Sequence, residues 1–173
     1  MTKITTSSVA GINLIKKFES FKSKPYICPA GVPTIGYGNT FYENGVKVKM
    51  TDPAITEQRA DQLLRFILKT FEQSVDSFCR DDVNQYQFDA LSSFAYNCGV
   101  QNLKTSTLLK KVNVNPNDPT IKDSFMKWVF GGDGTHNRVD DDGDGLVDEA
   151  GERQKLKGLL NRRTAEAELY FKK

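Results

Sequence analysis

VAGINLIKKFESFKSKPYICPAGVPTIGYGNT, residues 9–40, contains the change of pattern that decides the fold. In its first half, apolar side chains recur three or four positions apart from Val9 to Phe18, after serines that can cap a helix. From Lys24 onward, prolines and glycines divide the chain into short β-prone pieces. The segment therefore predicts a helix that ends near Glu19 and is followed by a small sheet.

The chain beyond this change of pattern is mostly helical. Asn44-Gly45 lies between two β-prone segments, 34–37 and 46–48, and predicts the turn of an antiparallel hairpin. Thr56 is placed to cap a long amphipathic helix that runs to Val75. Further helices are predicted for residues 85–98, 106–112, 119–130 and 159–171.

These elements predict an α+β fold in a single domain over residues 1–173. A small β-containing lobe (about 20–60) would be joined by a long helix to a larger helical lobe (1–19 and 61–173). A cleft between two such lobes is the natural place for a ligand.

The charge of the chain is distributed unevenly. The net charge is +2, but residues 133–153 carry −6 and the remainder therefore carries +8. A basic body favours an anionic partner such as a bacterial wall polymer. Nucleic acid is not predicted as a partner, because the sequence has no basic block with interleaved aromatic residues. No apolar run approaches the ~20 residues of a membrane span, and the N-terminus is too polar for a signal peptide, so we expect production in the cytoplasm.

The three cysteines, Cys28, Cys79 and Cys98, form an odd set without the spacing of a zinc site. We expect reduced thiols, as is usual for a cytoplasmic product. A disulfide between Cys79 and Cys98 is the alternative.

Glu19 is the carboxylate that most suggests catalysis, because it stands between Phe18 and Phe21 at the predicted end of a helix. Apolar surroundings raise the pKa of a carboxyl group, which can then hold a proton near neutral pH and give it to a leaving oxygen. A glutamate at a helix end is, however, more often a solvated surface residue. Its position alone leaves both interpretations open.

Three residues in this region, Glu19, Cys28 and Thr34, are separated by eight and five residues. The segments around and beyond them are 18–21, 33–40, 56–64, 84–99, 106–109 and 158–166. Together these segments resemble, in order along the chain, the phage lysozymes of glycoside hydrolase family 24, including those of T-even phages. The resemblance implies a lysozyme-like fold and hydrolysis of the β-1,4 bond between N-acetylmuramic acid and N-acetylglucosamine in bacterial peptidoglycan.

The resemblance also implies a role for each of these three residues. Glu19 would be the catalytic acid, and Thr34 would hold the attacking water, because a hydroxyl group both donates and accepts hydrogen bonds. Cys28 stands where many family members have a carboxylate, and a thiol with its ordinary pKa of about 8.5 is uncharged. Either its surroundings ionise the thiol, or Glu19 and a water on Thr34 suffice, or Cys28 is only a small buried side chain.

Four further residues, Thr40, Tyr96, Asn97 and Thr107, match positions that line the saccharide cleft in the family. Asn97 would bond to an N-acetyl group, and Tyr96 would offer an aromatic edge to a sugar. Each also has a structural alternative, since a tyrosine packs well in a helix and a threonine can cap or turn.

Residues 131–155 form an acidic insertion relative to many family members. Their sequence DDDGDG at 140–145 matches the start of a calcium-binding loop. The predicted Ca²⁺ ligands are Asp140, Asp142, Asp144, the Leu146 carbonyl and Asp148. The twelfth position of the loop is Gly151 in place of a bidentate glutamate, so a solvated acidic loop is the alternative. The single histidine, His136, is expected to be a surface residue.

Two other functions are compatible with the sequence. A lytic transglycosylase keeps the acid and needs no second carboxylate, which agrees with Cys28. A non-catalytic wall-binding protein would use the cleft and the acidic loop, but the spacing of Glu19 and Thr34 argues against it. The resemblance further implies a monomer that needs no cofactor for catalysis and reaches the wall from the host cytoplasm with the help of a holin.

Overall fold

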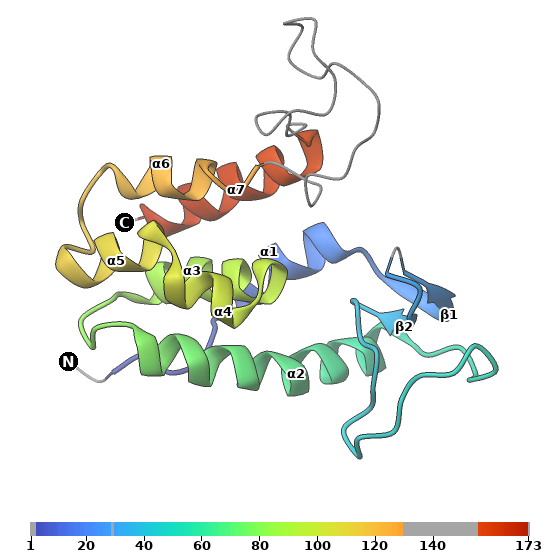
Figure 1. Ribbon diagram of the computed structural model, residues 1–173. Coiled ribbons are helices and arrows are strands. Elements are labelled where there is room, and N and C mark those ends of the chain that lie inside the picture. Colours follow the sequence, from blue (N-terminus) through green and yellow to red (C-terminus); the bar gives the residue numbers. More distant parts are fainter. Residues whose placement is uncertain (1–2, 29, 130–155, 173) are drawn as a thin grey trace, which may run out of the picture.

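A computed structural model describes residues 3–28, 30–129 and 156–172, and it consists mainly of helices (Figure 1). The predicted α+β class is confirmed. None of the helices in these ranges is long and apolar enough to cross a membrane. The described elements are α1 (Val9–Glu19), β1 (Lys22–Ile27), β2 (Pro33–Gly36), α2 (Glu57–Phe78), α3 (Gln85–Cys98), α4 (Val100–Thr105), α5 (Thr107–Val114), α6 (Ile121–Met126) and α7 (Lys157–Tyr170).

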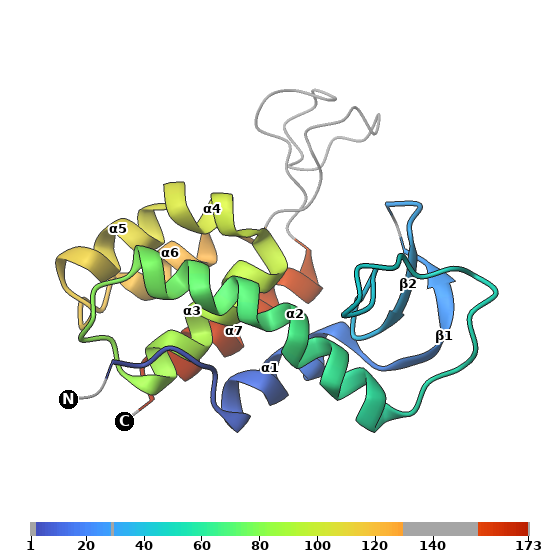
Figure 2. The same cartoon turned by 90° about the horizontal axis from the view of Figure 1, so that it is seen from below.

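The strands lie at one end of the molecule and α3 to α7 at the other, with α2 extending along both (Figure 2). α3 is the central helix and packs against α1, α2, α4 and α7. All residues from Gln87 to Ala95 are buried, so α3 has almost no solvent-facing side over that length. The larger hydrophobic cluster surrounds α3, and two smaller ones join the first half of α2 to α1 and to the β region. The β region is therefore held to the rest of the molecule mainly through α1 and α2.

The strand pairing predicted for the hairpin around Asn44-Gly45 is wrong, because residues 34–37 do not pair with residues 46–48. The sheet consists of β1 and β2, which pair antiparallel. Residues 46–48 form no strand, and only an isolated bridge joins Phe41 to Lys47. The turn itself exists, with Gly45 at a φ of +78°. The sequence placed the turn correctly but assigned it to the wrong pair of strands.

The start of α1 is held by buried acidic side chains of two other helices. Asp89 of α3 is fully buried and accepts hydrogen bonds from the Ser8 backbone N–H (2.8 Å) and from the Ser8 hydroxyl. Glu72 of α2 accepts from the Ser7 backbone N–H at 2.7 Å. Unpaired N–H groups at a helix start carry partial positive charge, so carboxylates stabilise it. This fixes α1, whose other end reaches the candidate site.

Gly11 is required by the packing of α1 on α3, and we predict that Gly11→Ala destabilises the protein. A Cβ atom at this position would lie 2.7 Å from the Asp89 Cγ. The usual gain of about 1 kcal/mol for alanine over glycine in a helix is then outweighed, for a net loss of about 2 kcal/mol. Denaturant unfolding measures the change. The control is Gly158→Ala in α7, where no described residue lies within 4 Å of the added atom; an equal effect at both positions would contradict the prediction.

Candidate active site

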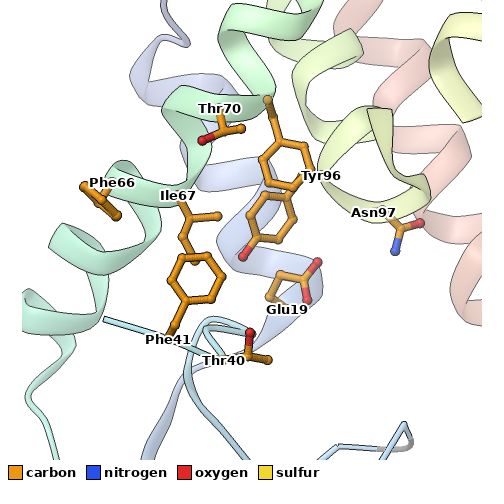
Figure 3. A pocket seen from close by; sticks show the side chains of 10 residues that line it. Glu19, Thr40, Phe41, Phe66, Ile67, Thr70, Tyr96 and Asn97 are labelled. Atoms are coloured by element: carbon orange, nitrogen blue, oxygen red, sulfur yellow. The ribbon is translucent and has the colours of Figure 1, made fainter. Parts of the chain in front are cut away.

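A cavity of about 430 Å³ lies where the β region meets the helices (Figure 3). Its walls come from the end of α1, the segment after β2, the middle of α2 and the end of α3. Figure 3 shows Glu19 between Asn97 on one side and Phe41 and Ile67 on the other. The lining residues are Glu19, Gly38, Thr40, Phe41, Phe66, Ile67, Thr70, Phe71, Tyr96 and Asn97.

Glu19 is the last residue of α1 and is ion-paired with Arg162 of α7. The Arg162 Nη1 lies 2.6 Å from the Glu19 Oε1, and the two side chains are 5% and 22% exposed. The guanidinium also lies 5.6 Å from the centre of the Phe18 ring. Directly after Glu19 the chain turns sharply at Ser20, which has a φ of +57°. The carboxylate is thus partly exposed and held by a cation, rather than enclosed by apolar groups alone as the sequence suggested.

Arg162 is supported from behind by Glu166, one turn further along α7. Glu166 is fully buried and accepts a hydrogen bond from the Ser93 hydroxyl at 2.8 Å. It also accepts from the Arg162 Nε at 3.3 Å and from the Arg163 Nη2 at 2.9 Å. A planar guanidinium with donors on two edges can bridge two carboxylates. Arg162 does so between Glu19 at the cavity and Glu166 in the core.

Gly38 and Tyr96 form the part of the wall closest to Glu19. Gly38 has a φ of +94°, and a Cβ atom there would lie 3.5 Å from the Glu19 Oε2 and 3.6 Å from the Tyr96 hydroxyl. The Tyr96 hydroxyl donates to the Tyr37 carbonyl at 2.8 Å and so connects α3 to the segment after β2. Burial raises the pKa of Tyr96 well above its usual value, so the hydroxyl stays a donor. The absence of a side chain at Gly38 leaves one edge of the carboxylate open.

Cys28 and Thr34 lie together at the turn that joins β1 to β2. The Val32 backbone N–H and then the Thr34 hydroxyl lower the pKa of the Cys28 thiol below its ordinary value. Thr34 is 2% exposed, and its hydroxyl donates to the Val32 carbonyl at 2.9 Å. The Thr34 hydroxyl has only one proton, so it donates a hydrogen bond either to the Val32 carbonyl or to the Cys28 thiolate. Burial, followed by the negative charges of Cys28 and Glu19, raises the pKa of Tyr26, which therefore lies within electrostatic range of both.

The structure brings together some of the predicted site residues. Glu19, Thr40, Tyr96 and Asn97 line the cavity, whereas Cys28 and Thr34 are not among its lining residues. Thr107 is exposed at the start of α5, a helix that Ser106 caps, and also does not line the cavity. All three cysteines are free thiols, so the alternative disulfide is not formed. The predicted Ca²⁺ ligands Asp140, Asp142, Asp144, Leu146 and Asp148 lie outside the described residues, as does His136.

Sequence reasoning missed Arg162 and the apolar part of the cavity wall. Phe41 and Phe66 are 41% and 39% exposed, which is unusual for large apolar side chains. A signal was present for Phe66, because it lies outside the apolar stripe of the amphipathic helix α2. Arg162 is 143 positions from Glu19, and its only sequence signal was that it lies within the segment 158–166 that resembles the family.

The chain is similar to known proteins along most of its length. The family model described as phage lysozyme matches residues 16–166. The chain is 42% identical over 135 residues to an endolysin of Bacillus phage B103, a match that covers 75% of this chain and 48% of that protein, about half its length.

Two solved structures are similar to this one over nearly their whole length. The endolysin from Escherichia coli O157:H7 phage FAHEc1 has a TM-score of 0.80 at 29% identity, covering 99% of this chain and 96% of that one. The muramidase domain of SpmX from Asticaccaulis excentricus has a TM-score of 0.77 at 28% identity, covering 98% and 100%. Since the family model spans most of the sequence, from the end of α1 into α7, the chain belongs to the phage lysozyme family.

Proposed function

We propose that this protein is an endolysin of glycoside hydrolase family 24 that hydrolyses the β-1,4 bond between N-acetylmuramic acid and N-acetylglucosamine in bacterial peptidoglycan. The observation that carries the proposal is the position of Glu19, partly exposed on the cavity wall and held by Arg162 at 2.6 Å. The names of its relatives, endolysin and muramidase domain, agree with this chemistry.

The cavity and the turn between β1 and β2 then each have a role in glycoside hydrolysis. Glu19 gives a proton to the leaving oxygen, and Arg162 fixes the direction of its carboxyl group. Phe41 and Phe66 offer exposed apolar faces to sugar rings along the cleft. Thr34 holds the attacking water through its hydroxyl oxygen while its proton serves the Val32 carbonyl. Cys28 would take the place of the second carboxylate, since hydrogen bonds from the Val32 backbone and the Thr34 hydroxyl lower the pKa of its thiol.

Product analysis tests this function directly. Purified peptidoglycan is incubated with the protein, and the soluble fragments are examined by mass spectrometry. We expect fragments that end in reducing N-acetylmuramic acid. Fragments cut only in the peptide stems, or no soluble fragments at all, would refute the proposal.

The alternative reaction is that of a lytic transglycosylase. Glu19 is the only carboxylate among the described residues that line the cavity, and Cys28 takes the place of a second one. An enzyme that closes the muramic acid onto its own hydroxyl needs an acid but no activated water. Fragments with 1,6-anhydro ends in the same product analysis would establish this reaction.

We predict that Cys28→Asp keeps most of the activity and that Cys28→Ala loses about tenfold, equivalent to one favourable contact in the transition state. The thiol has a lowered pKa, whereas burial raises the pKa of Cys98 and raises that of Cys79 to about 12. Limited alkylation should therefore modify Cys28 first and inhibit the enzyme. Cys28→Asp is the control, since alkylation should leave it active. Full activity in Cys28→Ala would make the thiol a spectator.

We also propose that the protein reaches the cell wall from the host cytoplasm only after a holin has permeabilised the membrane. The test is expression in bacteria with and without a membrane-permeabilising agent. Cells should stay intact until the agent is added and then lyse rapidly. Lysis without the agent would contradict holin dependence but not the wall-hydrolysing activity.

The calcium site in residues 140–148 stays a prediction from the sequence. With Gly151 at the twelfth position of the loop, we expect a weak site with a Kd on the order of 10⁻⁴ M or higher. Millimolar Ca²⁺ should raise Tm slightly, and Asp142→Ala combined with Asp144→Ala should remove this shift. Calorimetric titration without heat, together with a melting curve insensitive to EDTA, would favour the acidic-loop alternative.

A further inference from the structure

Arg163 lies in the core behind the cavity and is fully buried. Its Nη2 donates to the Glu166 Oε1 at 2.9 Å, and its Nη1 lies 2.9 Å from the Cys98 Sγ. The guanidinium packs 4.8 Å from the centre of the Phe94 ring. From this position the Nη2 also donates to the Asn97 Oδ1 at 2.9 Å. A buried cation thus contacts an exposed amide on the cavity wall.

This contact fixes which end of the Asn97 side chain is free. An arginine can only donate hydrogen bonds, so the amide oxygen must face Arg163. The Cys98 thiol, 3.8 Å from the same oxygen, is a donor as well. The Asn97 Nδ2 is the free end, and no described residue accepts a hydrogen bond from it. Asn97 therefore presents N–H donors to the cavity, while the amide reversed by 180° would present an acceptor.

Glu166 makes this arrangement rigid. Its carboxylate lies in the core and binds Arg162 and Arg163 together, with the Ser93 hydroxyl as a third donor. Arg162 holds Glu19 and Arg163 holds Asn97, so the two functional side chains share one buried anchor. A shift of either arginine would disturb the other through Glu166.

We propose that Arg163, anchored by Glu166, is a positioning residue that makes Asn97 a hydrogen-bond donor and thereby selects glycans that carry N-acetyl groups. The acetamido carbonyl is an acceptor that matches the free N–H of Asn97. A sugar without the acetyl group carries an ammonium instead, which can only donate and which meets the positive charge of Arg163 behind the amide. This inference rests on the proposed glycan hydrolysis.

The test compares kcat/KM on three substrates made from one peptidoglycan sample: untreated, chemically de-N-acetylated, and re-acetylated. We expect the unmodified protein to prefer the acetylated substrates by about tenfold, the effect of one good hydrogen bond. Asn97→Asp keeps an oxygen for Arg163 but has no donor, and its carboxylate attracts an ammonium. The preference should vanish or reverse, mainly through KM. The control is Asn13→Asp, the same charge change at an exposed position of α1.

A second variant tests Arg163 itself. In Arg163→Lys a charge remains beside Glu166, but a single ammonium cannot also hold the Asn97 amide. We expect the N-acetyl preference, measured as the ratio of kcat/KM on the re-acetylated and de-N-acetylated substrates, to fall toward one, whatever the change in overall activity that reaches Glu19 through Glu166 and Arg162. Should this variant not fold, the Tm of Asn97→Asp measures the same contact, because a carboxylate facing Arg163 should give a Tm at least as high as that of Asn13→Asp.

The outcomes separate this inference from the proposed function. If the unmodified protein cleaves none of the three substrates, both fail. If it cleaves them and Asn97→Asp or Arg163→Lys keeps the full preference for N-acetyl groups, only the role of Arg163 and Asn97 is refuted. A Tm of Asn97→Asp below that of Asn13→Asp would refute the contact with Arg163.

Discussion

Glu19→Gln is expected to reduce peptidoglycan hydrolysis by at least about a hundredfold, the usual contribution of a general acid. The amide oxygen can still accept the hydrogen bond from Arg162, so the side chain keeps its place. It has no acidic proton to give to the leaving oxygen. The loss should therefore appear in kcat more than in KM, because the geometry for substrate binding is unchanged.

Clearance of a peptidoglycan suspension measures this effect, with circular dichroism to verify folding. The control is Glu168→Gln, the same change at an exposed position of α7. Activity of Glu19→Gln within a few-fold of the unmodified protein would show that another group is the acid.

Glu166→Gln is expected to cause the largest loss of stability. Glu166 is the shared partner of two arginines that are 4% and 0% exposed. Removal of its charge leaves the buried Arg163 without its carboxylate partner and Arg162 with Glu19 alone, and breaking a buried ion pair in this way costs about 3 kcal/mol or more. For a protein of this length, Tm should fall by roughly 10 °C.

Thermal and denaturant unfolding of Glu166→Gln and Glu168→Gln form a matched pair on one helix. The exposed position should change the free energy of unfolding by no more than about 0.5 kcal/mol. Equal effects at both positions would mean that the buried cluster is not essential to the stability of the fold.

The helices could be predicted where local signals agree. The predicted helix 85–98 coincides with α3, because Asn84 and Gln87 form a capping box at its start and Gly99, with a φ of +89°, ends it. The helix predicted for 119–130 is shorter in the structure and corresponds to α6, Ile121–Met126. α6 has no side-chain cap at its start, so its first residue carries no sequence signal. The short helix α4 was not predicted at all.

Of the two strands, β2 (Pro33–Gly36) lies within one residue of the predicted segment 34–37, whereas β1 could not be predicted. β1 has the sequence KSKPYI, and none of its residues is buried. Alternation of apolar and polar residues appears only when one face of a strand is buried, so this strand carries no such pattern. Its Pro25 also argues against a strand, although proline is tolerated where a strand lies at the edge of a sheet. A two-stranded sheet has only edges.

The candidate site could likewise be predicted only in part: some of its residues are marked by the sequence, and others are placed by tertiary packing. The family spacing marks Glu19, and local sequence explains its position at the end of a capped helix. Its partner Arg162 and the anchor Glu166 are fixed by the packing of α7 on α1 and α3, which no local pattern encodes. The sequence predicted apolar surroundings for Glu19. In the structure its carboxylate also contacts a cation, Arg162 of α7, which lies over the Phe18 ring.

The ion pair between Glu19 and Arg162 also governs when the active site can be completed during synthesis. The two residues are 143 positions apart. At the usual rate of about 5–20 residues per second, a ribosome adds that length in roughly 7–30 s. During this interval a growing chain already contains the acid but not the helix that orients it. The timing of completion is therefore set by emergence of α7 from the ribosome, and a chain that stops before Lys157 contains Glu19 without its arginine.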